Sequence, residues 1–122
     1  MLVPANTRND FFSIVSNTCG GYSFYKDAKL LRLTRYRYND IPADTNGKYL
    51  YIKDGDTVWN PGWQPTKTEL DAYECRHGIG YSRFTGKKNE VEASVLTFVP
   101  MNDTCEVSQL TLTNTSSAKK DL

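Results

Sequence analysis

Apolar and polar residues alternate along much of this chain with a period of two, and the alternating runs are short. In residues 91–99, Val91, Ala93 and Val95 alternate with polar neighbours, and the second half of the run is apolar on both sides. A period of two places successive side chains on opposite faces of a β-strand. Residues 49–52 (YLYI) are apolar or aromatic on both faces, as expected of a strand that is covered on both sides.

Turn-forming residues separate these runs at short intervals, as at Asn46-Gly47 and Asp54-Gly55. Residues 86–89 (GKKN) lie between two runs and predict a hairpin with a short basic loop. The apolar positions change parity within residues 105–113, and a β-bulge near Ser108 would return them to one face. The pattern predicts an all-β fold, an antiparallel two-sheet sandwich.

Two segments deviate from the simple strand pattern. Residues 25–31 contain helix formers sufficient for a turn or two, whereas residues 34–38 (TRYRY) alternate as a strand does. No internal repeat or coiled-coil heptad is visible.

The length of 122 residues predicts one domain at most, and a net charge of +1 gives no field that would attract nucleic acid or an anionic membrane. The three cysteines, Cys19, Cys75 and Cys105, are odd in number and form no C-x-x-C pair. This spacing argues against a disulfide framework and favours a reducing compartment. The N-terminus has no apolar stretch of signal-peptide length, and no run is long enough to span a membrane. We expect a cytoplasmic protein.

Three blocks in a fixed order carry more information than the composition. They are residues 20–28 (GGYSFYKDA), 33–39 (LTRYRYN) and 70–78 (LDAYECRHG). Together they resemble the N-terminal domain of the disaccharide phosphorylases of glycoside hydrolase family ninety-four, which include the cellobiose, cellodextrin and chitobiose phosphorylases. The resemblance runs from about Asp10 to the C-terminus.

The resemblance implies a fold and an activity. The family's N-terminal region is a large two-sheet β-sandwich, followed by a linker and an α/α-barrel catalytic domain. The family reaction is the phosphorolysis of a β-linked disaccharide, with inversion, to a sugar 1-phosphate and a free sugar. Inorganic phosphate is a co-substrate, no metal or organic cofactor is implied, and members commonly form homodimers.

The resemblance also predicts a division of the chain. Residues 1–9 form a divergent lead-in, residues 10–122 form part of the N-terminal sandwich, and the catalytic barrel is absent. In the family, the catalytic acid and most of the phosphate site belong to that barrel, so we expect no catalytic residue here and no activity of the isolated chain. Two alternatives stay open: a stand-alone carbohydrate-binding module, and an inactive structural remnant.

Aromatic residues are the first candidates for contact with a sugar. Trp59 and Trp63 flank Asn60-Pro61-Gly62, and indole rings on a loop offer platforms for sugar rings, although packing at the end of a sandwich explains them equally well. In the block 20–28, we expect Tyr22 and Phe24 to anchor the segment in the sandwich and Tyr25 to face the substrate cleft.

Charged residues give weaker candidates. Arg35 and Arg37 would share one face of a strand, which suits either a sugar or a nucleic acid, but one basic stripe in a nearly neutral chain does not indicate nucleic-acid binding. Surface charge accounts for the carboxylates between 69 and 74. Asp54-Gly55-Asp56 lacks the remaining ligands of a calcium loop. Cys75 and His77 are two ligands short of a structural zinc site, and as a nucleophile pair they lack a visible orienting group.

Overall fold

The computed structural model describes residues 10–35 and 46–122, and these residues form eight strands and no helix. All paired strands are antiparallel, which confirms the predicted all-β class. The strands are β1 (Phe11–Val15), β2 (Gly21–Tyr25), β3 (Ile52–Asp54), β4 (Thr57–Trp59), β5 (Ala72–Gly78), β6 (Tyr81–Lys88), β7 (Val91–Phe98) and β8 (Val107–Asn114).

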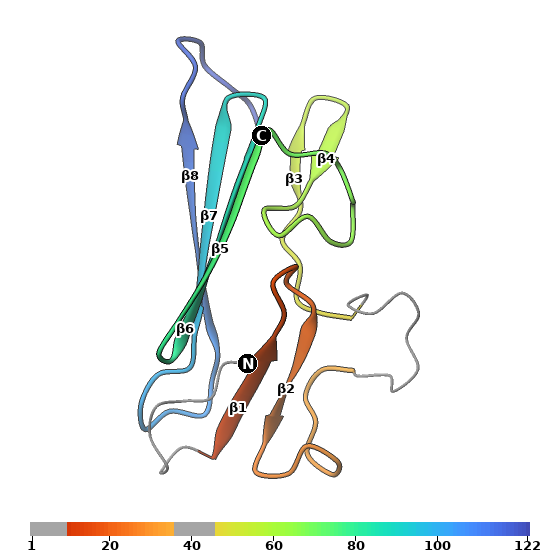
Figure 1. The fold of residues 1–122 in the computed structure, drawn as a ribbon, viewed down its shortest axis with the longest axis vertical. Coiled ribbons are helices and arrows are strands. Elements are labelled where there is room, and N and C mark those ends of the chain that lie inside the picture. The colour runs from red at the N-terminus through yellow and green to blue at the C-terminus, as the bar shows by residue number, and fades with distance from the viewer. Residues whose placement is uncertain (1–9, 36–45) are drawn as a thin grey trace.

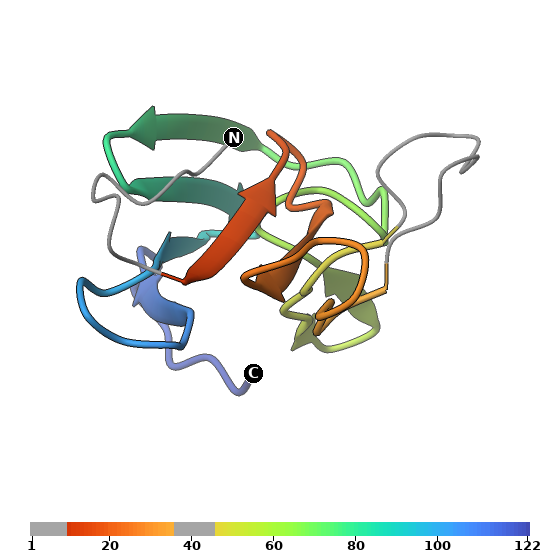
Figure 2. The ribbon, with the colours of Figure 1, turned by 90° about the horizontal axis from the view of Figure 1, so that it is seen from below.

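Two layers make up the sandwich. One layer is the four-stranded sheet β5-β6-β7-β8, a meander of sequential strands. The other layer consists of two short hairpins, β1-β2 and β3-β4, which lie one beyond the other alongside the long sheet (Figure 1). Viewed from below, the β1-β2 hairpin crosses in front of the sheet (Figure 2).

The core lies between the β3-β4 hairpin and the end of the long sheet near the β6-β7 turn. Ile52 and Trp59 form one cluster with Val91 and Ala93, and Leu70 packs against it. The predicted alternation in β7 is confirmed, because its odd-numbered positions are buried and its even-numbered positions are partly exposed. Since β7 is flanked by β6 and β8, its buried face is the centre of the core.

The hairpin turn between β6 and β7 is shifted from its predicted place. Lys88 pairs with Val91, so the two turn residues are Asn89 and Glu90, and residues 86–88 belong to β6. Both turn residues have left-handed φ angles, 48° and 60°, as a type I′ hairpin turn requires. The hairpin was predicted correctly, but the position of its loop at residues 86–89 was wrong. Strand pairing extends through the two lysines, and asparagine tolerates the left-handed conformation that the turn requires.

The bulge expected near Ser108 is also absent. β7 and β8 pair one to one from Val91 with Asn114 to Phe98 with Val107. The change of parity is therefore real, and β8 carries apolar residues on both faces. Leu110 and Leu112 face the same side as the core and are still 39% and 43% exposed, because β8 is the outermost strand of the described sheet.

Other segments differ in smaller ways. After β2, the Asp27 carboxylate accepts backbone hydrogen bonds from Lys29 and Leu30, both of 2.7 Å, so this segment is a turn and no helix. Only Ile52 of the predicted strand 49–52 lies in a strand. The predicted strand 34–38 falls mostly outside the described residues. The described residues contain no helix long and apolar enough to cross a membrane.

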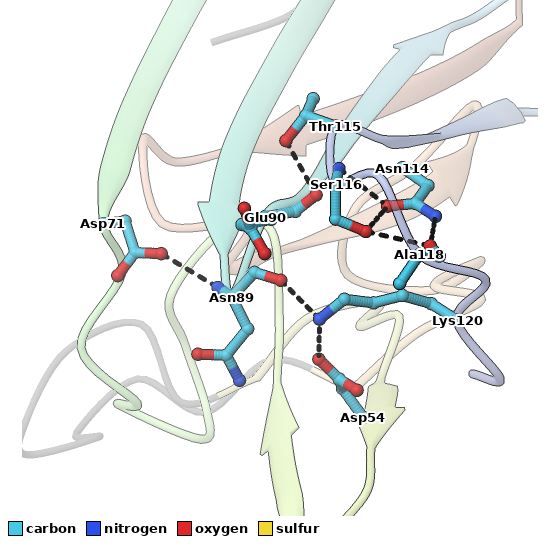
Figure 3. A network of polar contacts seen from close by, with 9 residues as sticks. All are labelled: Asp54, Asp71, Asn89, Glu90, Asn114, Thr115, Ser116, Ala118 and Lys120. Carbon is cyan, nitrogen blue, oxygen red and sulfur yellow. Dashed lines mark hydrogen bonds and ion pairs between the residues drawn. The ribbon is translucent and has the colours of Figure 1, made fainter.

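A polar network joins the C-terminal segment to both layers (Figure 3). Lys120 Nζ donates to Asp54 Oδ2 at 3.2 Å and to the carbonyl oxygen of Asn89 at 2.6 Å. The backbone amide of Asn89 donates in turn to Asp71 Oδ2 at 2.8 Å. Since Asp54 belongs to β3 and Asn89 to the β6-β7 turn, one lysine links the two layers at this end of the sandwich.

Candidate functional site

The structure does not gather the residues that the sequence singled out. Tyr25 lies at the end of β2, remote from the loop after β4 that carries Trp63 (Figure 1). Trp59 ends β4. Arg35 is exposed, and Arg37 lies outside the described residues. The described candidates therefore divide between two regions of the second layer.

The β2 strand has the predicted alternation but the opposite orientation. Ser23 is the buried position, at 2% exposure, and Tyr25 shares its face. Tyr22 and Phe24 occupy the outer face, where Phe24 stacks on Phe12 with ring centroids 5.1 Å apart. The prediction that Tyr22 and Phe24 anchor the strand in the sandwich was wrong, because the buried Ser13 and Ser23 occupy the inward face of the hairpin and the aromatic rings pack beside one another on the outer face.

Trp59 is a core residue. It is fully buried at 0% exposure within the cluster of Ile52 and Val91, and its indole nitrogen has no hydrogen-bond partner among the described residues. A ligand at the surface of this domain cannot stack on it. The structure therefore supports the alternative that Trp59 packs inside the sandwich and is not a platform for a sugar ring.

Trp63 is 37% exposed and lies in a loop with a rigid base, residues 60–67. Asn60 is buried; its amide donates to the Leu50 carbonyl oxygen at 2.6 Å, and its Oδ1 accepts from the Gly62 amide at 2.6 Å. An added Cβ on Gly62 would lie 2.2 Å from Cys19 Sγ, so only glycine allows the loop to approach this closely. These contacts fix the loop from which Trp63 projects.

An open groove of about 430 Å³ lies beside this loop. Two aromatic side chains line the groove together with charged and hydroxyl groups. The lining residues are Thr18, Trp63, Lys67, Glu69, Leu70 and Tyr73. Tyr73 is 40% exposed, and its hydroxyl donates to the Asn17 carbonyl oxygen. Partial burial raises the pKa of the Tyr73 phenol, which keeps this donor protonated. The sequence identified only Trp63 here, because the other side chains come together only through the fold.

Cysteine and histidine meet on β5. Cys75 Sγ lies 3.4 Å from His77 Nε2, and His77 Nδ1 lies 2.6 Å from Ser82 Oγ on β6. The orienting group that the sequence did not reveal is thus Ser82, which the antiparallel register places opposite His77. Burial raises the pKa of the Cys75 thiol, which disfavours the nucleophilic thiolate. The raised pKa is that of a resting thiol and not of an activated nucleophile.

A second polar cluster occupies the space between β2 and the start of β8. Glu106 accepts hydrogen bonds from the Ser23 hydroxyl at 2.8 Å and from Lys48 Nζ, and Ser13 Oγ lies 3.4 Å from Ser23 Oγ. Ser13, Lys48 and Glu106 border a cavity of about 350 Å³ whose other walls are mainly apolar. Because the carboxylate and the ammonium are already paired with each other, the cluster holds the layers together and leaves no unpaired charge for a ligand.

The carboxylates near β5 have structural partners. Asp71 accepts the Asn89 amide and lies 3.7 Å from Lys88 Nζ, while Glu74 pairs with Arg76 at 2.9 Å on the outer face. Over residues 10–35 and 46–122, no group of three or more histidine, cysteine, aspartate or glutamate side chains could hold a metal ion. By contrast, Lys67 and Glu69, which line the Trp63–Tyr73 groove, form no ion pair within the described residues.

Comparison with known proteins supplies the wider context. A family model described as "Glycosyl hydrolase 94, supersandwich domain" matches residues 7–122. Among curated proteins, the chain is similar to the N,N'-diacetylchitobiose phosphorylase of Vibrio furnissii, with 35% identity over 129 aligned residues that cover 98% of this chain and 16% of that protein.

Two further relatives show the same relationship. The N,N'-diacetylchitobiose phosphorylase of Vibrio proteolyticus is 36% identical over 123 residues, which cover 93% of this chain and 15% of that protein. The solabiose phosphorylase of Paenibacillus borealis is 42% identical over 77 residues, which cover 62% of this chain and 10% of that protein. The chain thus spans between 10% and 16% of the length of these three relatives.

Proposed function

The chain belongs to the glycosyl hydrolase 94 supersandwich family, as its sequence blocks predicted, and on that premise we propose that it serves as the N-terminal part of a disaccharide phosphorylase. The reaction would be the inverting phosphorolysis of a β-linked disaccharide. A phosphate oxygen bonds to the anomeric carbon, the glycosidic C–O bond breaks, and an acid protonates the leaving sugar oxygen. The observation that carries this proposal is the family match over residues 7–122.

We assign catalysis itself to another part of such an enzyme. Among the described carboxylates, Asp71 and Glu74 are paired with basic or amide partners and Glu106 is paired with Lys48. Glu69 lines an open groove whose lining includes one cation, Lys67, which is not the cluster of cations that a phosphate pocket needs. No cofactor is needed for phosphorolysis beyond the co-substrate phosphate. The isolated chain would therefore be inactive.

Domain packing is the role that the surface supports best. The outer face of the β1-β2 hairpin carries Phe12 and Phe24 in stacked contact and Tyr22 beside them. The turn after β2 adds the exposed side chains of Leu30, Leu31 and Leu33. Apolar groups gathered on one side favour contact with another protein surface. We assign this side to contacts with the rest of the phosphorylase chain or with the second subunit of a homodimer.

Tyr25 and Arg35 remain our proposed substrate-proximal residues at this end of the domain, and Arg37, which lies outside the described residues, remains one on the basis of the sequence alone. Lys26 lies over the Tyr25 ring, 5.1 Å from its centroid, so a cation and an aromatic plate are adjacent there. We place the protein in the cytoplasm, in keeping with its three free cysteines. Its partners would be a carbohydrate and the remaining enzyme, and neither nucleic acid nor membrane.

A chimera tests the proposal. The matching N-terminal part of the Vibrio furnissii N,N'-diacetylchitobiose phosphorylase is replaced by this chain, and phosphate-dependent release of sugar 1-phosphate is measured. We expect turnover by the chimera, and none by the isolated chain or by the relative lacking its N-terminal part. Turnover by the isolated chain, or a chimera no more active than the truncated relative, would contradict the proposal.

A stand-alone carbohydrate-binding module is the second candidate, and the exposed indole of Trp63 is the observation in its favour. An inactive structural remnant would show neither binding nor activity in the chimera. The two measurements together separate the three possibilities.

A further inference from the structure

We propose that the Trp63–Tyr73 groove is a carbohydrate subsite that takes a neutral β-linked oligosaccharide. The groove is defined by Thr18, Trp63, Lys67, Glu69, Leu70 and Tyr73. The proposal rests on the proposed function for its ligand class, since the relatives' names specify disaccharide phosphorylases. It goes beyond that function by assigning a site away from the β2 end of the domain.

Two partly exposed aromatic side chains supply the apolar walls. Trp63 and Tyr73 are 37% and 40% exposed, whereas the other tryptophan is fully buried. A β-linked pyranose has equatorial substituents and a flat face of C–H groups, which packs well on an indole or phenol ring. Aromatic rings of this kind combine an apolar body with a polar edge, so they suit a ligand that is itself amphipathic.

The backbone that carries the indole is held in place before any ligand arrives. Trp63 has a left-handed φ of 73°, a conformation that residues with a Cβ rarely adopt. Its amide donates to the Asn60 carbonyl oxygen at 3.0 Å, and its own carbonyl accepts from the Lys67 amide at 2.8 Å. A loop backbone fixed in this way loses little conformational freedom when a sugar stacks on the ring that it carries.

Tyr73, which also lines the groove, is fixed by its own contacts. It lies in β5, an edge strand of the described sheet, and its hydroxyl donates to the Asn17 carbonyl oxygen in the β1-β2 turn. Leu70 closes the floor and itself packs against the core cluster. The two aromatic walls are thus anchored to different layers of the sandwich.

The polar groups of the groove are of the kind that sugar hydroxyls need. Within the described residues, the side chains of Lys67 and Glu69 form neither an ion pair nor a hydrogen bond, unlike the paired Lys48 and Glu106 of the interlayer cavity. Glu69 offers acceptor oxygens and Lys67 offers donor hydrogens to hydroxyl groups. One positive and one negative charge cancel, so the groove favours a neutral polyol over a phosphate or an acidic ligand.

Binding to the complete chain provides the first test. Cellotetraose and chitotetraose are titrated up to about 10 mM, which covers millimolar dissociation constants. Ligand-observed NMR detects binding, and tryptophan emission reports on the environment of Trp63. We expect saturable binding of at least one sugar, with a change in emission and protection from acrylamide quenching. Absence of saturable binding of both sugars would overturn the proposal.

Variants locate the site. We expect Trp63→Ala to weaken binding at least tenfold, which corresponds to about 1.4 kcal/mol, and Glu69→Gln and Lys67→Met to weaken it severalfold. Tyr51→Ala is the matched control, because Tyr51 is an exposed aromatic residue outside the groove. Circular dichroism checks that each variant is folded; if Trp63→Ala is not, the Lys67 and Glu69 variants decide. Equal binding by the wild-type chain and the folded groove variants would refute the site.

The chimera keeps this proposal separate from the proposed function. An active chimera, together with an isolated chain that binds no sugar, rejects the groove and retains the phosphorylase role. Sugar binding that depends on Trp63, together with an inactive chimera, retains the groove and rejects the phosphorylase role.

Discussion

The Ser23 hydroxyl donates a hydrogen bond of 2.8 Å to the carboxylate of Glu106, across 83 positions of the sequence. Lys48 donates to both of these residues, so three segments meet at one point between the layers. Ser23 is buried and the Glu106 side chain is only 9% exposed. The β1-β2 hairpin is therefore attached to the long sheet by polar contacts as well as by apolar packing.

Removing this carboxylate should destabilise the chain. We expect Glu106→Ala to lower the free energy of unfolding by about 1–3 kcal/mol, because the buried Ser23 hydroxyl and the Lys48 ammonium both lose their carboxylate acceptor. Urea unfolding measures the change. Asp103→Ala, at an exposed position of the same loop, is the control and should stay within about 0.5 kcal/mol of the wild type. Equal effects of the two substitutions would mean that the contact contributes nothing.

A second prediction concerns Gly86, which lies under the loop that carries Trp63. An added Cβ would lie 2.8 Å from the Pro61 carbonyl oxygen and 2.9 Å from Pro61 Cα. Backbone atoms cannot rotate away, so we expect Gly86→Ala to destabilise by about 1–3 kcal/mol. Thr85→Ala, the preceding position on the other face of β6, should change stability much less. Thermal unfolding, followed by circular dichroism, compares the stability of the two variants. A Gly86→Ala variant as stable as the wild type would contradict the close contact between Gly86 and the Pro61 backbone.

Truncation of the two tryptophans should lower the stability of the chain to very different extents. Trp59→Ala removes a fully buried ring from the core, and we expect a loss of about 3–5 kcal/mol. Trp63→Ala removes a partly exposed ring from the groove, and we expect a loss below about 1 kcal/mol. Chemical unfolding gives both values. A larger loss for Trp63 than for Trp59 would show that the loop ring, and not the core ring, supports the fold.

The local sequence pattern is sufficient to predict which face of a strand is buried in some strands and not in others. The alternation in β7 predicted its buried face correctly, because a period of two depends only on backbone geometry. The same rule predicted the alternation of β2 but not which face points inward. That choice depends on Glu106 and Lys48, which contact Ser23 from distant parts of the chain.

The candidate site was less predictable for the same reason. Trp59 and Trp63 are four positions apart and look alike in sequence, yet the structure buries one and exposes the other. Tyr73 appeared only as one residue of the block 70–78. Its place in the groove follows from the position of β5 at the edge of the described sheet and from its bond to Asn17, which is a tertiary contact.

The buried thiol of Cys19 predicts a loss of stability in alkali. Burial, reinforced by nearby Cys75, raises the pKa of Cys19 from 9.0 to about 12. The folded chain therefore holds this proton more tightly than the unfolded chain, so the contribution to stability is complete below pH 9 and is lost as the pH rises towards 12. We expect the free energy of unfolding to fall between these values, and Cys19→Ala to flatten that slope. An unchanged slope in the variant would exclude Cys19 as its source.

The last prediction tests the β2 end of the domain in the active chimera with the Vibrio furnissii enzyme. Tyr25 ends β2 beneath Lys26, whereas Phe24 stacks on Phe12 on the outer face. If Tyr25 faces the substrate, Tyr25→Ala should lower kcat/KM about tenfold, or about 1.4 kcal/mol, with little change in melting temperature. Phe24→Ala should instead lower the melting temperature, since it removes a stacked and half-buried ring worth about 1–3 kcal/mol. Intact kinetics in the Tyr25 variant would exclude this end of the domain from the substrate site, and an equal loss of stability in both variants would assign Tyr25 to packing.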